Sequence, residues 1–327
     1  MNRSLRLVTL LLTFTIATFA GRAADAQDRA PATTGILLMA HGGSTGWNDQ
    51  VRAVAKETDK QMPTEVAFGM ADRSTLQQGV DALTKRGVTA IVAVPLFVSS
   101  HSSVIESTRY LLGLRADAPE DLAAFASMSG MGHDGGTAHA MSGHDMAAHA
   151  ADDTKDANGL PRPVTSTVPI RMSPALDRHP IVADILADRA AAFGKDPSHE
   201  VVILAAHGPN DDAANAEWLD DMAALAARIA GKAPYARIEY VTLRDDAEPA
   251  VRDRATADLR QKVQAANDAG YRVLVTPLLL SYGGIENGLR QRLDGLQHAL
   301  SPQALLPDAR IASWVLESAR TIESARK

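Results

Sequence analysis

Two short apolar runs in the chain share one pattern. Residues 36–40 and 201–206 are continuously apolar, and each run is followed directly by His-Gly, at His41 and at His207. An apolar run of this length that ends near glycine is typical of a strand buried on both faces of a parallel sheet. The repetition predicts that one fold is used twice along the chain.

Helix-like and strand-like segments alternate after each of these runs. In the first half we expect helices at residues 47–61, 74–85 (capped by Ser74) and 180–190, and strands at 66–70, 88–98 and 164–172. In the second half we expect helices at 211–230, 248–269 and 316–327, and strands at 236–243, 272–280 and 311–315. This alternation predicts an α/β fold in two tandem domains, each a mainly parallel sheet flanked by helices.

The ends of the repeats divide the chain. The stretch Gly194-Lys-Asp-Pro197 separates a first repeat at residues 35–195 from a second at 199–327. Ahead of them, basic residues precede an apolar run at 7–20, and Ala24-Asp25-Ala26 follows. This is the signature of a secretory signal peptide, so we expect residues 1–26 to be removed and 27–34 to be a disordered lead-in. A membrane anchor is the alternative, but the run is shorter than the roughly 20 residues that span a bilayer.

The amino-acid composition excludes several classes of partner and of metal site. The chain is 46% hydrophobic and 22% charged, which is typical of a globular protein, and its net charge of −6 argues against a nucleic-acid partner. It contains no cysteine, which excludes disulfides, cysteine-based zinc sites and iron–sulfur clusters. Any metal ion must therefore be bound by histidine, methionine, carboxylate or backbone oxygen. With the signal peptide cleaved, we expect a periplasmic protein without a stable membrane anchor.

Two histidines follow predicted strands of the first half. His41 ends the first strand, and His101 lies in the Ser-Ser-His-Ser-Ser stretch beyond the third. Strands of a parallel sheet end at one edge, where ligands of α/β proteins bind, so the two side chains are expected at the same edge. A lone histidine is usually structural, but two that converge indicate a functional site. Glu106 is either a third ligand or proton acceptor, or a solvated helix carboxylate.

The second half keeps one of these histidines. Val94-Pro95-Leu96 matches Thr276-Pro277-Leu278, but the serine-rich stretch with His101 is replaced by Ser281-Tyr282-Gly283-Gly284. A two-histidine site can therefore exist only in the first half, unless His207 contributes across the interface. The two glycines would let a flat ligand approach the backbone closely. Tyr282 either replaces the missing histidine as an acid/base group or packs.

An insertion rich in histidine and methionine interrupts the first repeat at residues 127–153. Its histidines are His133, His139, His144 and His149, and its methionines are Met128, Met131, Met141 and Met146. The stretch has no helical or strand period, so we expect a flexible loop. Imidazole suits Cu, Ni, Co and Zn, and thioether adds a preference for Cu(I), which indicates metal binding. The alternative is a mobile polar linker.

Several of these residues together carry a family resemblance. They are the strand with His41-Gly-Gly, the helix start at Trp47-Asn48, the Val94-Pro-Leu-Phe run, His101, and the Asn215/Trp218 pattern after His207-Gly. In this order, and in two copies, they resemble the sirohydrochlorin cobaltochelatase family of class II tetrapyrrole chelatases. Long members of that family also carry a histidine-rich stretch.

The resemblance implies a site and a reaction. It implies two lobes that enclose a cleft for a tetrapyrrole such as sirohydrochlorin, with His41 and His101 binding the incoming metal and accepting pyrrole protons and Glu106 assisting. The residues expected to line the tetrapyrrole site are Gly42, Gly43, His207, Tyr282, Gly283 and Gly284. Cobalt is the expected metal, with nickel, iron or copper as alternatives. The export signal and the His/Met-rich insertion favour a different function, a periplasmic metal-binding or metal-delivery protein without turnover.

Overall fold

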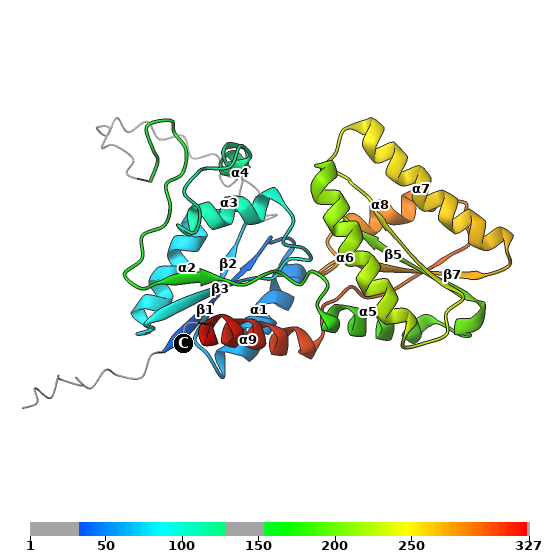
Figure 1. The fold of residues 1–327 in the computed structure, drawn as a ribbon, viewed down its shortest axis with the longest axis horizontal. Helices are drawn as coiled ribbons and strands as arrows, with labels where there is room; N and C mark the ends of the chain where they lie inside the picture. The colour runs from blue at the N-terminus through cyan, green and yellow to red at the C-terminus, as the bar shows by residue number, and fades with distance from the viewer. Residues whose placement is uncertain (1–32, 129–153, 326–327) are drawn as a thin grey trace, which may run out of the picture. The chain divides into compact units, whose positions relative to one another are not determined.

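The computed structural model describes residues 33–128 and 154–325 of the chain (Figure 1). The first half contains β1 (Thr34–Ala40), α1 (Thr45–Asp59), β2 (Thr64–Phe68), α2 (Arg73–Lys85), β3 (Ala90–Pro95), α3 (Ser103–Leu111), α4 (Leu122–Met128), β4 (Ile170–Met172) and α5 (Pro180–Phe193). A 3₁₀ turn at Pro197–His199 leads into the second half, with β5 (Glu200–Ala206), α6 (Asp212–Ala230), β6 (Arg237–Thr242), α7 (Pro249–Asp268), β7 (Arg272–Leu278), α8 (Ile285–Arg292), β8 (Ala299–Leu300) and α9 (Ala309–Ser324).

Two parallel four-stranded sheets repeat one topology. Their strand orders are β2-β1-β3-β4 and β6-β5-β7-β8. The register is also repeated, because Met39 pairs with Pro95 in the first sheet and Ala205 pairs with Pro277 in the second. Pro95 and Pro277 are therefore equivalent positions. The predicted α/β fold with two tandem domains, each built on a parallel sheet flanked by helices, is confirmed.

Each central strand is buried on both faces. In β1, Ile36 and Leu38 belong to the hydrophobic cluster that includes α1 and α9, whereas Leu37 and Met39 belong to the cluster that includes α2, α3 and α4. Alternate residues of a strand point to opposite faces of a sheet, so an unbroken apolar run is what two helix-covered faces require. This is why both His-Gly runs are continuously apolar.

Two helices pack on the sheet of the other half. Helix α5 belongs to the first repeat in sequence but packs on α6 and β7, and α9 ends the chain but packs on α1 and β3 (Figure 1). Their side chains join the two halves in one hydrophobic cluster that contains both Leu38 and Leu204. Each sheet is therefore covered in part by a helix from the other half of the sequence. The predicted boundary at residues 195–199 divides the two sheets but not the helices that pack on them.

The end of the chain differs from the prediction. The expected strand at 311–315 and helix at 316–327 are one helix, α9, and the fourth strand of the second sheet is the two-residue β8. Buried positions in α9 include Ile311, Val315 and Ala319, four residues apart. That spacing is helical, and the prediction gave too much weight to the β-branched residues within it.

Three smaller predictions were also wrong. Helix α2 begins at Arg73 and is capped by Asp72, whose carboxylate accepts from the backbone N–H groups of Ser74 and Thr75, so Ser74 is not the cap. The strand expected at 164–172 is limited to Ile170–Met172. Residues 127 and 128, which were expected to belong to the insertion, are the last two residues of α4.

Some predictions fall on residues outside those described. The signal peptide, nearly all of the lead-in at 27–34, and the site residues His133, His139, His144, His149, Met131, Met141 and Met146 lie in residues 1–32 or 129–153. Across residues 33–128 and 154–325, no helix combines the length and apolar character that a membrane crossing requires.

Asp308 provides a pH-dependent test of how α9 is held. Burial acts to raise the pKa of this N-cap carboxyl, but hydrogen bonds from Arg310 and the charge of Arg189 on α5 outweigh it and lower the pKa below 3.8. The ionised carboxylate of Asp308 therefore stabilises the folded state above pH 3.8, and this stabilisation is lost as the pH falls through the lowered pKa. We expect Asp308→Asn to reduce the free energy of unfolding at pH 7 by about 1–2 kcal/mol. Urea unfolding at pH 7 and pH 3 should show the difference shrinking in acid; an equal difference at both would contradict this role.

Candidate metal and tetrapyrrole site

His41 stands directly after β1 on a loop that needs glycine. Gly42 has φ +85°, a left-handed conformation that glycine adopts without strain. A Cβ on Gly43 would lie 3.2 Å from Cγ of Trp47, so a side chain there would crowd the indole. Asn48 clamps the loop, since its side-chain amide accepts from Gly43 N–H at 2.9 Å and donates to Gly43 O at 3.1 Å. The His-Gly-Gly and Trp47-Asn48 motifs thus form one rigid turn that holds His41.

The ring of His41 has a defined tautomer. Its Nδ1 lies 2.6 Å from the carbonyl oxygen of Gly42, a contact that requires the proton on Nδ1. The lone pair is then on Nε2, the nitrogen with which a neutral imidazole in this tautomer binds a metal ion. His207 repeats the arrangement in the second half, with Nδ1 2.9 Å from the carbonyl oxygen of Gly208.

His101 is held by a polar loop after β3. The hydroxyl of Ser99 accepts from the backbone N–H of His101 at 3.1 Å. Next to it, Ser100 donates its N–H and its hydroxyl to the two carboxylate oxygens of Asp177, at 2.5 and 2.8 Å. Asp177 has φ +43°, which is uncommon for a residue other than glycine and is typical of positions that the surrounding structure over-determines. The segment that precedes α5 therefore fixes the loop that carries His101.

Helix α6 of the second half contacts His101 directly. The indole N–H of Trp218 donates to the backbone carbonyl of His101 at 2.8 Å. One helical turn later, Oδ2 of Asp221 lies 3.8 Å from Nε2 of His101. The His101 loop is thus bound on one side by its own half and on the other by α6.

Asp221 is a buried carboxylate between Arg178 and the ring of His101. Its Oδ1 accepts from Nε of Arg178 at 2.6 Å, while its Oδ2 is buried without a hydrogen-bond partner. Burial raises the pKa of Asp221, as does the nearby charge of Asp177, while the hydrogen bond from Arg178 opposes the rise. Asp177, Arg178 and Asp221 were not among the predicted site residues, because they lie far from the His101 loop in the sequence and no local pattern indicates their contacts with it.

The predicted pair and Glu106 have different surroundings. Strands β1 and β3 are neighbours in the sheet, so His41 and His101 both follow strands at its carboxyl edge. Glu106, in the first turn of α3, accepts from Nη1 of Arg115 at 2.8 Å and is nearly half exposed. This salt bridge matches the solvated-carboxylate alternative that the sequence left open.

His207 has an acidic partner in the second half. Its Nε2 lies 3.3 Å from Oδ2 of Asp246, which is 72% exposed. Arg244 holds the same loop by donating to the carbonyl oxygens of Pro209 and Asn210, and its N–H donates to the His207 carbonyl. The histidine of the second half thus sits in its own network of hydrogen bonds and ion pairs.

The loop after β7 carries the remaining predicted residues. The Tyr282 hydroxyl donates to the backbone carbonyl of the buried Ser301, and burial raises the pKa of Tyr282 to about 12. A Cβ on Gly283 would lie 3.3 Å from Cδ1 of Trp47, and Gly284 has φ +133°. Glu286 accepts from the N–H groups of both glycines and so caps α8. The Trp47 contact and the positive φ give each glycine a structural reason, and their predicted role at a tetrapyrrole stays a prediction.

The hydrogen bond of Tyr282 gives a prediction. Tyr282→Phe removes the hydroxyl and leaves a buried carbonyl oxygen without its donor, which should cost about 1–2 kcal/mol of unfolding free energy. Because the phenol stays protonated at neutral pH, cobalt binding should be unchanged. Urea unfolding and cobalt titration measure the two effects. Unchanged stability with lost metal insertion would instead assign Tyr282 to the chemistry.

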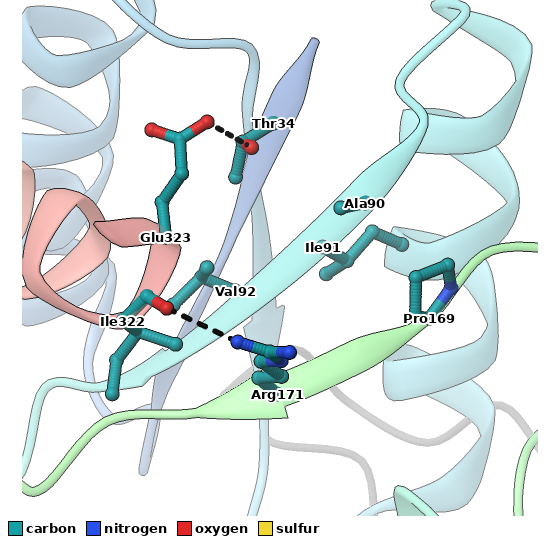
Figure 2. Close-up of a pocket in the computed structure, with 8 residues that line it drawn as sticks. All are labelled: Thr34, Ala90, Ile91, Val92, Pro169, Arg171, Ile322 and Glu323. Carbon is teal, nitrogen blue, oxygen red and sulfur yellow. Dashed lines mark hydrogen bonds between the residues drawn. The ribbon is translucent and has the colours of Figure 1, made fainter. Parts of the chain in front are cut away.

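A hollow of about 180 Å³ lies at the opposite edge of the first sheet (Figure 2). It is lined by Thr34 and Ala90, the first residues of β1 and β3, where the Thr34 hydroxyl donates to Glu323 of α9 at 2.6 Å. Arg171 extends beside it and donates to the Ile322 carbonyl at 3.4 Å. Because the histidines follow the carboxyl ends of these strands, this hollow is separate from the candidate site.

Comparison with known proteins identifies the fold. The CbiX family model matches residues 35–192. SirB from Bacillus subtilis with Fe3+ is similar, with TM-score 0.56, 17% identity, and coverage of 88% of this chain and 94% of that chain. The sirohydrochlorin chelatase SirB from Bacillus subtilis subspecies spizizenii in complex with cobalt is similar with TM-score 0.52, 15% identity, and coverage of 89% and 97%. No curated protein matches the chain.

The match and the fold agree on the first half. The matched residues include β1 with His41, β3 and the loop with His101. The structural similarity extends over the second half as well, and at these identities it establishes the fold. Residues 35–192 of this chain are therefore a CbiX-family domain, within a chain that has the chelatase fold in both halves.

Proposed function

We propose that this protein inserts a divalent metal ion, cobalt foremost, into a tetrapyrrole such as sirohydrochlorin. The observation that carries the proposal is that His41 and His101, within a CbiX-family domain, follow adjacent parallel strands at one sheet edge. Ligands of open α/β sheets bind at this edge. Both histidines stand on loops that hydrogen bonds hold in place, and such order favours catalysis.

The chemistry suits neutral imidazoles. Insertion requires that the metal shed water and that two pyrrole N–H protons leave, so the site needs both a metal ligand and a proton acceptor. Histidine can perform both tasks, because a neutral imidazole carries one lone pair that binds a metal ion or takes up a proton. In this proposal His41 and His101 bind the incoming ion, and as the ion passes to the tetrapyrrole nitrogens each freed imidazole lone pair accepts one pyrrole proton.

Metal delivery without turnover is the second candidate. The sequence observation that favours it is the tract with His133, His139, His144 and His149, together with the export signature at residues 1–26. An exported protein with such a tract would bind cobalt, nickel or copper through imidazole and thioether groups. We propose a periplasmic location for either function.

Cobalt insertion into sirohydrochlorin, followed by visible absorbance, separates the two functions. The full mature chain is mixed with cobalt and sirohydrochlorin, and the rate is compared with that of the uncatalysed reaction. A rate well above background supports the chelatase. A background rate, with tight cobalt binding that falls when residues 129–153 are deleted, supports metal delivery and overturns the chelatase proposal.

A further inference from the structure

A carboxylate of the second half faces the candidate metal ligand of the first. Asp221 is 6% exposed, its Oδ2 has no hydrogen-bond partner, and that atom lies 3.8 Å from Nε2 of His101. A separation of 3.8 Å is about 1 Å longer than a hydrogen bond. The His101 ring is 38% exposed, so a small rotation of the ring brings Nε2–H onto the carboxylate.

Two hydrogen bonds hold the Asp221 carboxylate and the backbone of the His101 loop in place. Nε of Arg178 fixes the other oxygen of Asp221 at 2.6 Å. Trp218, one turn earlier on α6, donates to the His101 carbonyl at 2.8 Å. Two side chains of one helix turn therefore contact the same residue, one at the backbone and one at the ring.

The pseudo-symmetric position supports a role linked to the histidine. Pro95 and Pro277 are equivalent, and the residues at the same distance after them in the sequence are His101 and Gly283. There the loop contacts α1, where the Ser281 hydroxyl donates to the neutral Gln50 side chain at 3.1 Å. In the half that lacks the histidine, this hydrogen bond therefore joins two uncharged side chains.

We propose that Asp221 is a positioning residue for His101, a carboxylate from the second half that holds the imidazole through Nε2 and thereby sets the orientation in which His101 binds metal. This inference rests on the proposed function, in which His101 is a metal ligand. With Nε2–H directed at Asp221, the lone pair is on Nδ1, which becomes the ligating nitrogen. Outer-shell carboxylates of this kind orient metal-binding histidines in many proteins.

The neighbouring Asp220 provides a matched control. It is exposed, stands on the same helix and also accepts from Arg178, at 2.6 Å through Nη2, but the contact to His101 belongs to Asp221. Asp220→Asn and Asp221→Asn each remove one negative charge and weaken one hydrogen bond from Arg178, since an amide oxygen still accepts but is uncharged. Only the second variant removes the negative charge that faces the imidazole.

The test is cobalt titration of the full mature chain by calorimetry, for wild type, His101→Ala, Asp221→Asn and Asp220→Asn. We expect His101→Ala to abolish one binding event, Asp221→Asn to weaken it by about 10–100-fold, and Asp220→Asn to leave it unchanged. Equal affinities for wild type, Asp221→Asn and Asp220→Asn, with binding lost in His101→Ala, would overturn the positioning role alone. Binding that is unaffected in His101→Ala would overturn both this inference and the metal-ligand role on which it rests.

Imidazole nitrogen NMR gives a readout that a merely structural role would not change. His101 signals are identified by their absence in His101→Ala. Wild type should show the Nε2–H form, Asp221→Asn a mixture of both tautomers, and Asp221→Glu a return toward the wild-type signal. An Nδ1–H form in wild type, or no change in Asp221→Asn, would overturn the proposal.

Discussion

We expect His41→Ala and His101→Ala each to lower the rate of cobalt insertion into sirohydrochlorin by at least about 100-fold, because each removes a metal ligand and a proton acceptor. Both side chains lie on surface loops beyond their strands, so the free energy of unfolding should change little. Single-turnover absorbance kinetics measure the rate, and urea unfolding checks that the variants remain folded.

Two other histidines serve as controls for this loss. His199 is 76% exposed and pairs with Asp196 in the turn before β5, so His199→Ala should leave the rate unchanged. His207 follows the equivalent strand of the second half but is paired with Asp246, and His207→Ala should cost less than either first-half variant. A greater loss in His207→Ala would move the site to the second half.

We expect Trp314→Ala to lower the free energy of unfolding by about 3–5 kcal/mol, the cost of removing a large, fully buried aromatic side chain. Trp314 is 2% exposed in α9 and belongs to the cluster that joins the two halves. Since α9 covers the sheet that carries His41, the loss should also lower the temperature at which metal insertion fails. Denaturant unfolding monitored by circular dichroism measures the effect.

The exposed Glu317, also on α9, is the control for this variant. Glu317→Ala keeps the helix and its buried face, so its unfolding free energy should stay within about 0.5 kcal/mol of wild type. Equal effects of the two substitutions would mean that α9 does not contribute to the core as described.

The parts of the fold that depend on a local hydrophobic pattern were predictable from the sequence. The two apolar runs with His-Gly specified both central strands and the duplication, because a strand buried on both faces has an unbroken apolar sequence. The exchange of α5 and α9 was not predictable, since the buried face of a helix does not reveal which sheet it covers. The β-branched residues of 311–315 also hid a helical spacing.

The two histidines of the candidate site were also predictable from the sequence. His41 and His101 follow strands, and parallel topology brings such residues to one edge. The groups that hold His101, among them Asp177 and Asp221, come from an irregular segment and from a helix of the other half. Contacts of that range depend on tertiary packing, and spacing in the sequence does not encode them.

The most direct test of the metal site is anomalous X-ray diffraction at the cobalt edge, from crystals of the mature protein grown with cobalt. We expect a peak at about 2.0–2.1 Å from one imidazole nitrogen of each of His41 and His101, the usual length of a metal–nitrogen bond. Cobalt bound at His207 and Asp246 instead, with none at the first-half histidines, would contradict it.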